Sequence, residues 1–545
     1  MGNLRKQLFA QILISSTFFL GAFALPASNT DPNTNPTVVI ASGTIIGTAT
    51  HPASQPSSTR LANAYLGIPF ASPPERFSPP TKAAPWSSPL IAQAFRPACI
   101  QQFTNSGKSK DLAKQYFGNP TGPLPEESED CLYLNVFTPP NLSSSSKKAV
   151  MFWLFPGDLQ FGTASLPIYD GGALALSQDV VVVTINYRTN IFGFSNSPEI
   201  ATGSQNSGYL DQRFALQWVQ DNIAKFGGDP SRVTIFGDSA GGESVKQLLA
   251  NPPSPLPFSA AIMQSQQTLL MGSGSDSYKK VLQQFKCQGE ASPIACLRKV
   301  SATDIKAYIE SAALVFPPVN GDGTSISDVR GSITSNKWPK IPIMMGSTLN
   351  EGRVFLAVED VFGDGTSSMN TAWSMVGINS DKTKGLITPL YAGKALTDMA
   401  DRIITDVVFT CTTSSLSKLL ASKGYSVYRY RYDASFASTD IFPNAGAYHT
   451  SDIPSVFGTY PQYSKFGSIT QQQIDLSSYM QGVWGGFAKR VDFDSKWKRV
   501  GSTFLGLGNE LGLLTVNGLS AVASSQADYP CLVYGGLAEL AGFAY

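Results

Sequence analysis

The sequence predicts an α/β fold, in which one large domain is built on a mostly parallel β-sheet with helices on both faces. Several short runs of residues are almost wholly apolar, as strands are when helices cover both sides of a sheet. Amphipathic segments of helical length lie between these runs, and such alternation is typical of a parallel sheet. Of the 545 residues, 42% are hydrophobic and 11% are aromatic, which is enough apolar surface for a large core and argues against disorder.

The charge composition excludes several classes of function. The chain has 40 basic and 39 acidic residues, a net charge of +1, and contains no block of Lys and Arg. We therefore expect neither a nucleic-acid partner nor binding to an anionic membrane surface. The spacing of Cys and His gives no zinc pattern, and no glycine-rich phosphate loop is present, so we expect no metal and no organic cofactor.

The first elements of the sheet lie in the first half of the chain. Buried strands and helices are expected to alternate there: a strand at 149–155, a helix at 172–178, a strand at 180–187, a helix at 213–226, a strand at 233–236 and a helix from Gly241 onward. The helical segment at 213–226 has one broad apolar side. There is no internal repeat or long linker, so residues 25–545 are expected to form a single domain despite their length.

Residues 1–24 have the features of a cleaved signal peptide. Two basic residues precede a mostly apolar run at 8–20, and Ala22 and Ala24 provide the small residues of a cleavage site. A membrane anchor is the alternative, but the run is short and is interrupted by polar residues. We expect a secreted, extracellular protein without a stable membrane anchor.

Secretion also bears on the cysteines and on glycosylation. Six cysteines in an oxidising compartment are expected to be paired, but the sequence alone allows many alternative pairings. The sequon at Asn141 lies in a polar loop between two apolar runs. We expect this asparagine to carry a glycan.

The chemistry is predicted at a strand-to-helix junction. The five residues at 237–241 match the pattern G-x-S-x-G, with Ser239 at its centre. In this pattern the glycines allow a turn so sharp that the serine hydroxyl projects above the edge of the sheet. A simple glycine-rich turn is the alternative, but the strand before and the helix after favour a nucleophile.

A serine needs a base to take its proton, and histidine is the usual one near neutral pH. The chain contains only two histidines. His51 lies in a polar stretch near the N-terminus and is expected at the surface. By elimination, His449 is the expected base.

The base needs an acid to orient its ring. A further buried strand is predicted at 341–346, and Glu351 follows it closely, at the sheet edge where ligand sites lie. The order Ser239, Glu351, His449 also matches that of α/β-hydrolases. Asp452 is the rival acid, and we interpret it as a local loop or surface contact.

Further motifs are spread over about residues 64–457. They are Gly67-Ile68-Pro69-Phe70-Ala71, Glu129-Asp130-Cys131-Leu132-Tyr133-Leu134-Asn135, Asn186-Tyr187-Arg188, Leu210-Asp211-Gln212-Arg213, Phe226-Gly227-Gly228-Asp229-Pro230, and Glu351-Gly352. Through these motifs and the G-x-S-x-G pattern, the chain resembles the type-B carboxylesterase/lipase family, which has an α/β-hydrolase fold and includes cholinesterases and fungal esterases.

The resemblance implies two disulfides, Cys99 with Cys131 and Cys287 with Cys296. It leaves Cys411 and Cys531 unassigned. It also implies an oxyanion hole built from the backbone N–H groups of three residues: Gly157, Asp158 and Ala240.

The oxyanion loop departs from the family pattern, in which three small residues follow an aromatic residue or His. Here Pro156, Gly157 and Asp158 stand in that place. Pro156 lacks an N–H at a position that the family does not use. A carboxylate directed at a developing oxyanion would raise the barrier, so we expect the Asp158 side chain to point away. Gln266, where the family often has Gly, is a milder departure.

The resemblance implies a serine carboxylic-ester hydrolase that acts on a small-molecule or lipid ester through an acyl-enzyme. The loop at 100–130 carries many charges and no Trp, which favours a soluble ester and disfavours a quaternary-ammonium substrate. A lipase acting on acylglycerols or sterol esters is one alternative. A catalytically impaired binding or adhesion module is the other, because of the unusual oxyanion loop. The oligomeric state is left open.

Overall fold

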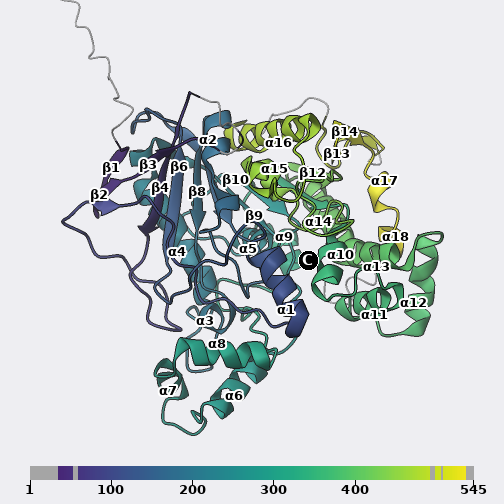
Figure 1. Cartoon of the computed structure of the whole chain (residues 1–545), viewed down its shortest axis with the longest axis horizontal. Coiled ribbons are helices and arrows are strands. Elements are labelled where there is room, and N and C mark those ends of the chain that lie inside the picture. Colours follow the sequence, from purple (N-terminus) through teal and green to yellow (C-terminus); the bar gives the residue numbers. More distant parts are fainter. Residues whose placement is uncertain (1–34, 53, 55–58, 491–496, 505–506, 535–545) are drawn as a thin grey trace, which may run out of the picture. The chain divides into compact units, whose positions relative to one another are not determined.

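The computed structural model describes residues 35–52, 54, 59–490, 497–504 and 507–534. Within them, an eleven-stranded sheet runs in the order β14-β13-β12-β11-β10-β9-β7-β8-β6-β4-β3 (Figure 1). Its strands are β3 (Thr48–Thr50), β4 (Ala62–Pro69), β6 (Tyr133–Thr138), β7 (Lys148–Leu154), β8 (Val181–Ile185), β9 (Gly228–Asp238), β10 (Ala260–Gln264), β11 (Ile343–Thr348), β12 (Val427–Tyr432), β13 (Leu511–Thr515) and β14 (Gly518–Val522). A smaller sheet contains β1 (Thr37–Ile40), β2 (Gly43–Ile46) and β5 (Leu90–Ile91).

The strands from β8 to β13 pair in parallel, and the pairs at both ends of the sheet are antiparallel. Every residue of β8, β10 and β11 is buried. Burial on both faces explains why these strands are apolar without alternation. The predicted fold class is confirmed: the sheet is mostly parallel in its centre and carries helices on both faces.

Helices α2, α15 and α16 contact one another on the sheet, and α5 and α14 pack against its central strands (Figure 1). The α-helices are α1 (Gly107–Ala113), α2 (Gly172–Gln178), α3 (Asn190–Gly193), α4 (Ser207–Asn222), α5 (Ala240–Ala250), α6 (Gly274–Gln284), α7 (Pro293–Arg298), α8 (Ala302–Ser311), α9 (Val329–Thr334), α10 (Glu351–Val358), α11 (Gly365–Met375), α12 (Asp381–Ile387), α13 (Leu396–Ile404), α14 (Cys411–Ser422), α15 (Ile453–Phe457), α16 (Gln471–Arg490), α17 (Ser525–Asp528) and α18 (Cys531–Tyr534). Short 3-10 helices are η2 (Pro167–Tyr169), η3 (Ile223–Phe226), η4 (Thr388–Tyr391) and η6 (Tyr460–Tyr463).

Two π-helical segments follow or precede regular helices: η1 (Lys114–Gly118) extends α1, and η5 (Thr405–Thr410) joins α13 to α14. Such segments are rare and occur frequently at functional sites. None of the described helices is long and apolar enough to span a bilayer. The described residues from Pro36 onward belong to one compact unit.

The predicted elements agree with the structure in type, but most boundaries differ, and the largest differences are in α4 and β9. The helix expected from residue 213 begins six residues earlier, at Ser207, and most residues of this added part are buried. The strand expected at 233–236 extends over Gly228–Asp238. α4 ends at Asn222, and the last four residues of the predicted helix form the 3-10 helix η3. Gly227, with a left-handed φ of 82°, follows η3, and Gly228 is already the first residue of β9.

Candidate active site

Four parallel strands bring the predicted site residues to one edge of the sheet. The segments that follow β7, β9, β11 and β12 carry the oxyanion loop, Ser239, Glu351 and His449 respectively. Parallel strands have their carboxyl ends at the same edge, so residues distant in the sequence meet there. Ser239 and His449 line the same pocket.

Ser239 lies in a sharp turn between β9 and α5. Its φ of 53° and ψ of −120° are rare for a residue other than glycine, and its N–H donates to the carbonyl of Gln264 at 2.9 Å. A Cβ on Gly241 would lie 2.0 Å from the carbonyl oxygen of Leu154, and one on Gly237 would lie 2.5 Å from the Gly241 backbone. Both glycines are therefore required by the close approach of three backbone segments.

The carboxylate of Glu351 forms a short contact with the imidazole of His449, with 2.5 Å between Oε2 and Nδ1. Its other oxygen, Oε1, accepts from the N–H of Thr348 and the hydroxyl of Ser265, both at 2.6 Å. Glu351 is completely buried and His449 is 2% exposed. The Glu351 side chain is thus held in one orientation by three partners, and it orients the ring in turn.

The rings of Phe355 and Phe409 lie against the imidazole, with centroids 5.1 and 5.0 Å from it. Phe355 stands one turn after Glu351 on α10, and Phe409 belongs to the π-helical segment η5. Neither phenylalanine was predicted from the sequence. Phe355 could have been found, because it stands one helical turn after Glu351 and so lies on the same side of α10. Nothing local in the sequence places Phe409 beside His449.

A network behind α10 ties the acid loop to the histidine loop. Asn350 exchanges backbone and side-chain hydrogen bonds with Ala447, and its amide group donates to Asp401 at 2.7 Å. Asp401 also accepts from the N–H of Gly352 at 3.1 Å and from the hydroxyl of Thr405. The start of α10, and with it Glu351, is therefore anchored on α13.

The pocket opens to solvent, and about 610 Å³ of space free of protein atoms lies in it when the open part is included. Apart from Ser239 and His449, its walls are mainly aromatic and apolar side chains: Tyr116, Phe117, Pro120, Phe161, Ile168, Tyr169, Phe355, Tyr448, Ile453 and Tyr463. Tyr116 and Phe117 come from the π-helical segment η1, which places them at the pocket. An aromatic cavity of this kind suits an apolar or aromatic organic group.

The oxyanion loop turns back on itself after β7. Gly157 has a φ of 134°, and a Cβ on it would lie 2.1 Å from the carbonyl oxygen of Phe161. Asp158 follows in a left-handed conformation, with a φ of 53°. Ala240 is the first residue of α5, so its N–H lies outside the hydrogen bonding of that helix.

The Asp158 carboxyl group is held by two donors. Oδ1 accepts from the N–H of Leu269 at 2.7 Å, and Oδ2 accepts from the side-chain amide of Gln160 at 3.1 Å. Asp158 nevertheless lines the pocket. Burial raises its pKa to about 6, although both hydrogen bonds and His449 act in the opposite direction.

Two further acids lie beneath the site. Asp452 is not the surface contact expected from the sequence: it is completely buried, and its Oδ2 accepts from Gln264 at 3.0 Å and from Tyr430 at 3.1 Å. Asp238, next to Ser239, is also completely buried. Burial raises the pKa of Asp452 to about 6 and that of Asp238 well above its usual range, and repulsion from Glu351 adds to both shifts.

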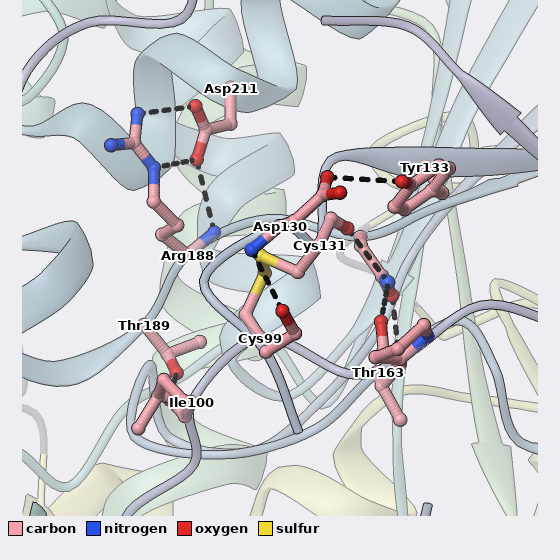
Figure 2. The surroundings of a disulfide bond; sticks show 12 residues. Cys99, Ile100, Asp130, Cys131, Tyr133, Thr163, Arg188, Thr189 and Asp211 are labelled. Atoms are coloured by element: carbon pink, nitrogen blue, oxygen red, sulfur yellow. Dashed lines mark hydrogen bonds and ion pairs between the residues drawn. A yellow bond between two sulfur atoms is a disulfide. The ribbon is translucent and has the colours of Figure 1, made fainter. Parts of the chain in front are cut away.

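Three disulfides are present among the described residues: Cys99–Cys131, Cys287–Cys296 and Cys411–Cys531. The first two are those that the family resemblance implies, and the third joins the pair that it left unassigned. Figure 2 shows the first bond beside the buried ion pair between Arg188 and Asp211, whose closest atoms are 2.7 Å apart. This region anchors the start of the 100–130 loop to the core.

The remaining predicted positions lie away from the pocket. His51 and Asn141 are exposed. Gln266 is buried, and its amide group donates to the hydroxyl of Thr413 at 3.0 Å. The predicted signal peptide, residues 1–24, lies outside the described residues.

Comparison with known proteins agrees with the motifs. A model of the carboxylesterase family matches residues 34–503. Carboxylesterase 1C of Rattus norvegicus is 33% identical over 497 residues, which cover 84% of this chain and 86% of that protein. The liver carboxylesterase of Sus scrofa is 32% identical over 477 residues, covering 78% and 80%. The cocaine esterase of Homo sapiens is 32% identical over 453 residues, covering 78% of each chain. On this similarity and these motifs, the chain belongs to the carboxylesterase family of serine ester hydrolases.

Proposed function

We propose that this ester hydrolase acts through a Ser-His-Glu triad and an acyl-enzyme on Ser239, with His449 as the base and Glu351 as the acid. The observation that carries the proposal is that Ser239 and His449 line one pocket while the buried Glu351 contacts the His449 ring. Ser239 stands on a strained turn at the pocket, and the His449 ring is fixed by a buried carboxylate at 2.5 Å. This combination of nucleophile, base and orienting acid activates a serine hydroxyl.

The proposed reaction proceeds in two halves. The ring nitrogen of His449 that does not face Glu351 takes the Ser239 proton as the hydroxyl oxygen attacks the ester carbonyl. The same nitrogen then gives the proton to the departing alcohol, which leaves an acyl group on Ser239. Water, deprotonated in the same way, releases the acid and regenerates the serine. Glu351 stabilises the imidazolium in both halves without taking the proton.

The N–H groups of Gly157, Asp158 and Ala240 are proposed to bind the oxyanion. The Asp158 side chain supports this assignment, because both of its oxygens are engaged, one by Leu269 and one by Gln160. These two donors, and not a bound oxyanion, determine where the carboxyl group lies. They argue against the alternative of a catalytically impaired binding module.

The substrate is proposed to be a soluble carboxylic ester rather than an oil droplet. In the 100–130 loop, Lys108 pairs with Asp360 at 2.7 Å and Lys110 pairs with Glu310 at 2.6 Å. The Lys108 side chain is 70% exposed. A helix with charged side chains and ion pairs is poorly suited to an interface with lipid, where an apolar face is needed.

We also propose that the protein is secreted, with residues 1–24 as a signal peptide and a glycan on Asn141. Three disulfides are consistent with an oxidising compartment. The asparagine is exposed in a turn, which supports access by the glycosylation machinery.

The test is covalent labelling of the purified protein with a fluorophosphonate, with the adduct located by mass spectrometry. We expect one adduct on Ser239 in the wild type and none in Ser239→Ala. His449→Ala and Glu351→Ala should label slowly while folding normally, whereas His51→Ala should label at the wild-type rate.

A folded wild-type protein that hydrolyses no aryl acetate and takes no label would overturn the proposal. Label on a different residue would overturn the assignment of Ser239 alone. Hydrolysis of a triacylglycerol emulsion that exceeds the rate on soluble esters would instead favour the lipase alternative.

A further inference from the structure

Asp158 is an unusual member of an otherwise uncharged wall. It is the only carboxylate among the described residues that line the pocket, and no Lys or Arg lies among them. The neighbours that act on its charge are Leu269, Gln160 and His449. The first two contribute neutral donors, and the third is neutral when it acts as a base. A negative charge on Asp158 is therefore stabilised by the N–H dipoles of Leu269 and Gln160 and not by a permanent cation.

The surroundings of Asp158 strengthen its electrostatic effect. Phe117, Phe161 and Phe355 line the same pocket, and their rings form one cluster with centroids 5.8 to 5.9 Å apart. Charges interact more strongly next to such apolar groups than in water, because little solvent lies between them. A substrate group that enters this pocket will sense the charge on Asp158.

We propose that Asp158 makes the pocket a filter for substrate charge, so that the enzyme selects neutral and cationic esters and rejects esters that carry a carboxylate. The inference rests on the proposed function, because it assigns a substrate class to the same site. The position of the residue supports it: Asp158 lines the pocket, and hydrogen bonds from the N–H of Leu269 and the side-chain amide of Gln160 hold its carboxyl group in place.

The pKa of Asp158 sets the pH range of the filter. Burial raises this pKa to about 6, so the carboxyl group is charged at pH 8 and largely neutral at pH 5. Other titratable groups face the pocket: His449 with Glu351 behind it, and four tyrosines. Burial raises the pKa of each tyrosine, so all four stay neutral in this range: Tyr116, Tyr169, Tyr448 and Tyr463. Both substrates react through His449, so its effect cancels when kcat/KM for one ester is divided by kcat/KM for the other.

The test compares three phenyl acetates of similar size with para substituents of different charge: a carboxylate, a carboxamide and a dimethylaminomethyl group, which is cationic at pH 8. Values of kcat/KM are measured for the wild type and for Asp158→Asn. The asparagine keeps the backbone N–H of the oxyanion hole and a side-chain oxygen for the N–H of Leu269.

We expect kcat/KM for the anionic ester, relative to the neutral one, to rise about tenfold in Asp158→Asn, because the repulsion is removed. For the cationic ester the same ratio should fall about threefold. An electrostatic effect changes the two kcat/KM ratios in opposite directions, because the two substrates carry opposite charges. A general disturbance of the site would lower both ratios.

The wild type provides a second, independent measurement. Its anionic-to-neutral ratio should rise about tenfold from pH 8 to pH 5, as Asp158 becomes protonated. If Asp158→Asn does not fold, the pH dependence of the wild-type ratio alone tests the charge filter. Ratios that change by less than twofold with both pH and substitution, in an enzyme that hydrolyses the neutral ester through Ser239, overturn the filter and leave the triad intact. If no neutral ester is hydrolysed, the proposed function itself has failed.

Discussion

At the scale of single residues, the geometry of the site depends on glycines at which a side chain would clash with neighbouring backbone atoms. Gly241 allows α5 to begin against the end of β7, and a Cβ there would lie 2.0 Å from a backbone oxygen of Leu154. Backbone atoms cannot move aside as the end of a flexible side chain can. The geometry of the Ser239 turn is therefore maintained by two close-packed backbone segments.

Replacing Gly241 with Ala should destabilise the protein by about 3 kcal/mol or more, since the added methyl group forces the strand and helix apart. Activity on a neutral ester should be lost in any protein that still folds. Gly385 in α12 is the matched control, because a Cβ there meets nothing within 4 Å. Gly385→Ala should raise the unfolding free energy by about 0.5–1 kcal/mol. Denaturant unfolding measures both, and equal effects would contradict the steric argument.

The residues of the proposed triad could be picked out in the sequence because each belongs to a local pattern or to a residue type that is rare in the chain. Ser239 stands in a five-residue motif, and His449 is one of only two histidines. Asp158 and Asp452 show the limit of such reasoning. The contacts of Asp158 with Leu269 and of Asp452 with Gln264 join segments 111 and 188 residues apart. Whether an acid is buried at such a place depends on the folded structure, which no local pattern encodes.

At the scale of elements, the position of Glu351, the proposed acid, depends on the packing of two helices. Glu351 is the first residue of α10, and Asp401 on α13 accepts hydrogen bonds from Gly352 and Asn350 at the start of that helix. Asn350 in turn exchanges hydrogen bonds with Ala447. Asp401 is thus a positioning residue, which acts on the chemistry through the loops that carry Glu351 and His449.

Removing the carboxyl group in Asp401→Ala should lower kcat about 10- to 100-fold, since a displacement of about 1 Å in a catalytic group has effects of this size. KM should change by less than about threefold. Asp401→Asn retains an acceptor for the N–H of Gly352 and should recover much of kcat. Steady-state kinetics on one neutral ester give both quantities. A large loss of thermal stability in Asp401→Ala with unchanged kcat would mean that the residue is only structural.

The buried strands were predictable because their apolar runs are short and end at turn residues. The predicted run at 341–346 largely coincides with β11, which is Ile343–Thr348. The two π-helical segments were not predictable. They are η1, Lys114–Gly118, and η5, Thr405–Thr410, and no pattern of residue types in the sequence marks such rare turns. These segments carry pocket and histidine contacts, so the aromatic part of the site could not be read from the sequence.

At the scale of the whole molecule, the three disulfides close loops of very different size. Cys411 and Cys531 are separated by 120 positions, whereas Cys287 and Cys296 are separated by 9. In each of these two pairs one cysteine is buried and the other is partly buried. A cross-link restricts the unfolded chain more when its loop is longer.

Replacing both Cys411 and Cys531 with Ala should therefore lower the unfolding free energy more than the same change at Cys287 and Cys296. Loop-closure entropy predicts a difference of about 2 kcal/mol. Denaturant midpoints of the two double variants and the wild type, under identical conditions, test this. Equal losses would mean that native-state packing around each bond, rather than loop length, sets its contribution.

The two histidines lie in very different surroundings, and this difference has a practical consequence. His51 is exposed, while His449 is buried against a carboxylate. In a protein of 58.2 kDa, incorporation of isotopically labelled histidine would give only two imidazole signals in a magnetic resonance spectrum. One belongs to His449, the proposed base, and the other belongs to a solvent-exposed reference. The hydrogen bond between the His449 ring and Glu351 can thus be studied in the unmodified protein, without any substitution at the site.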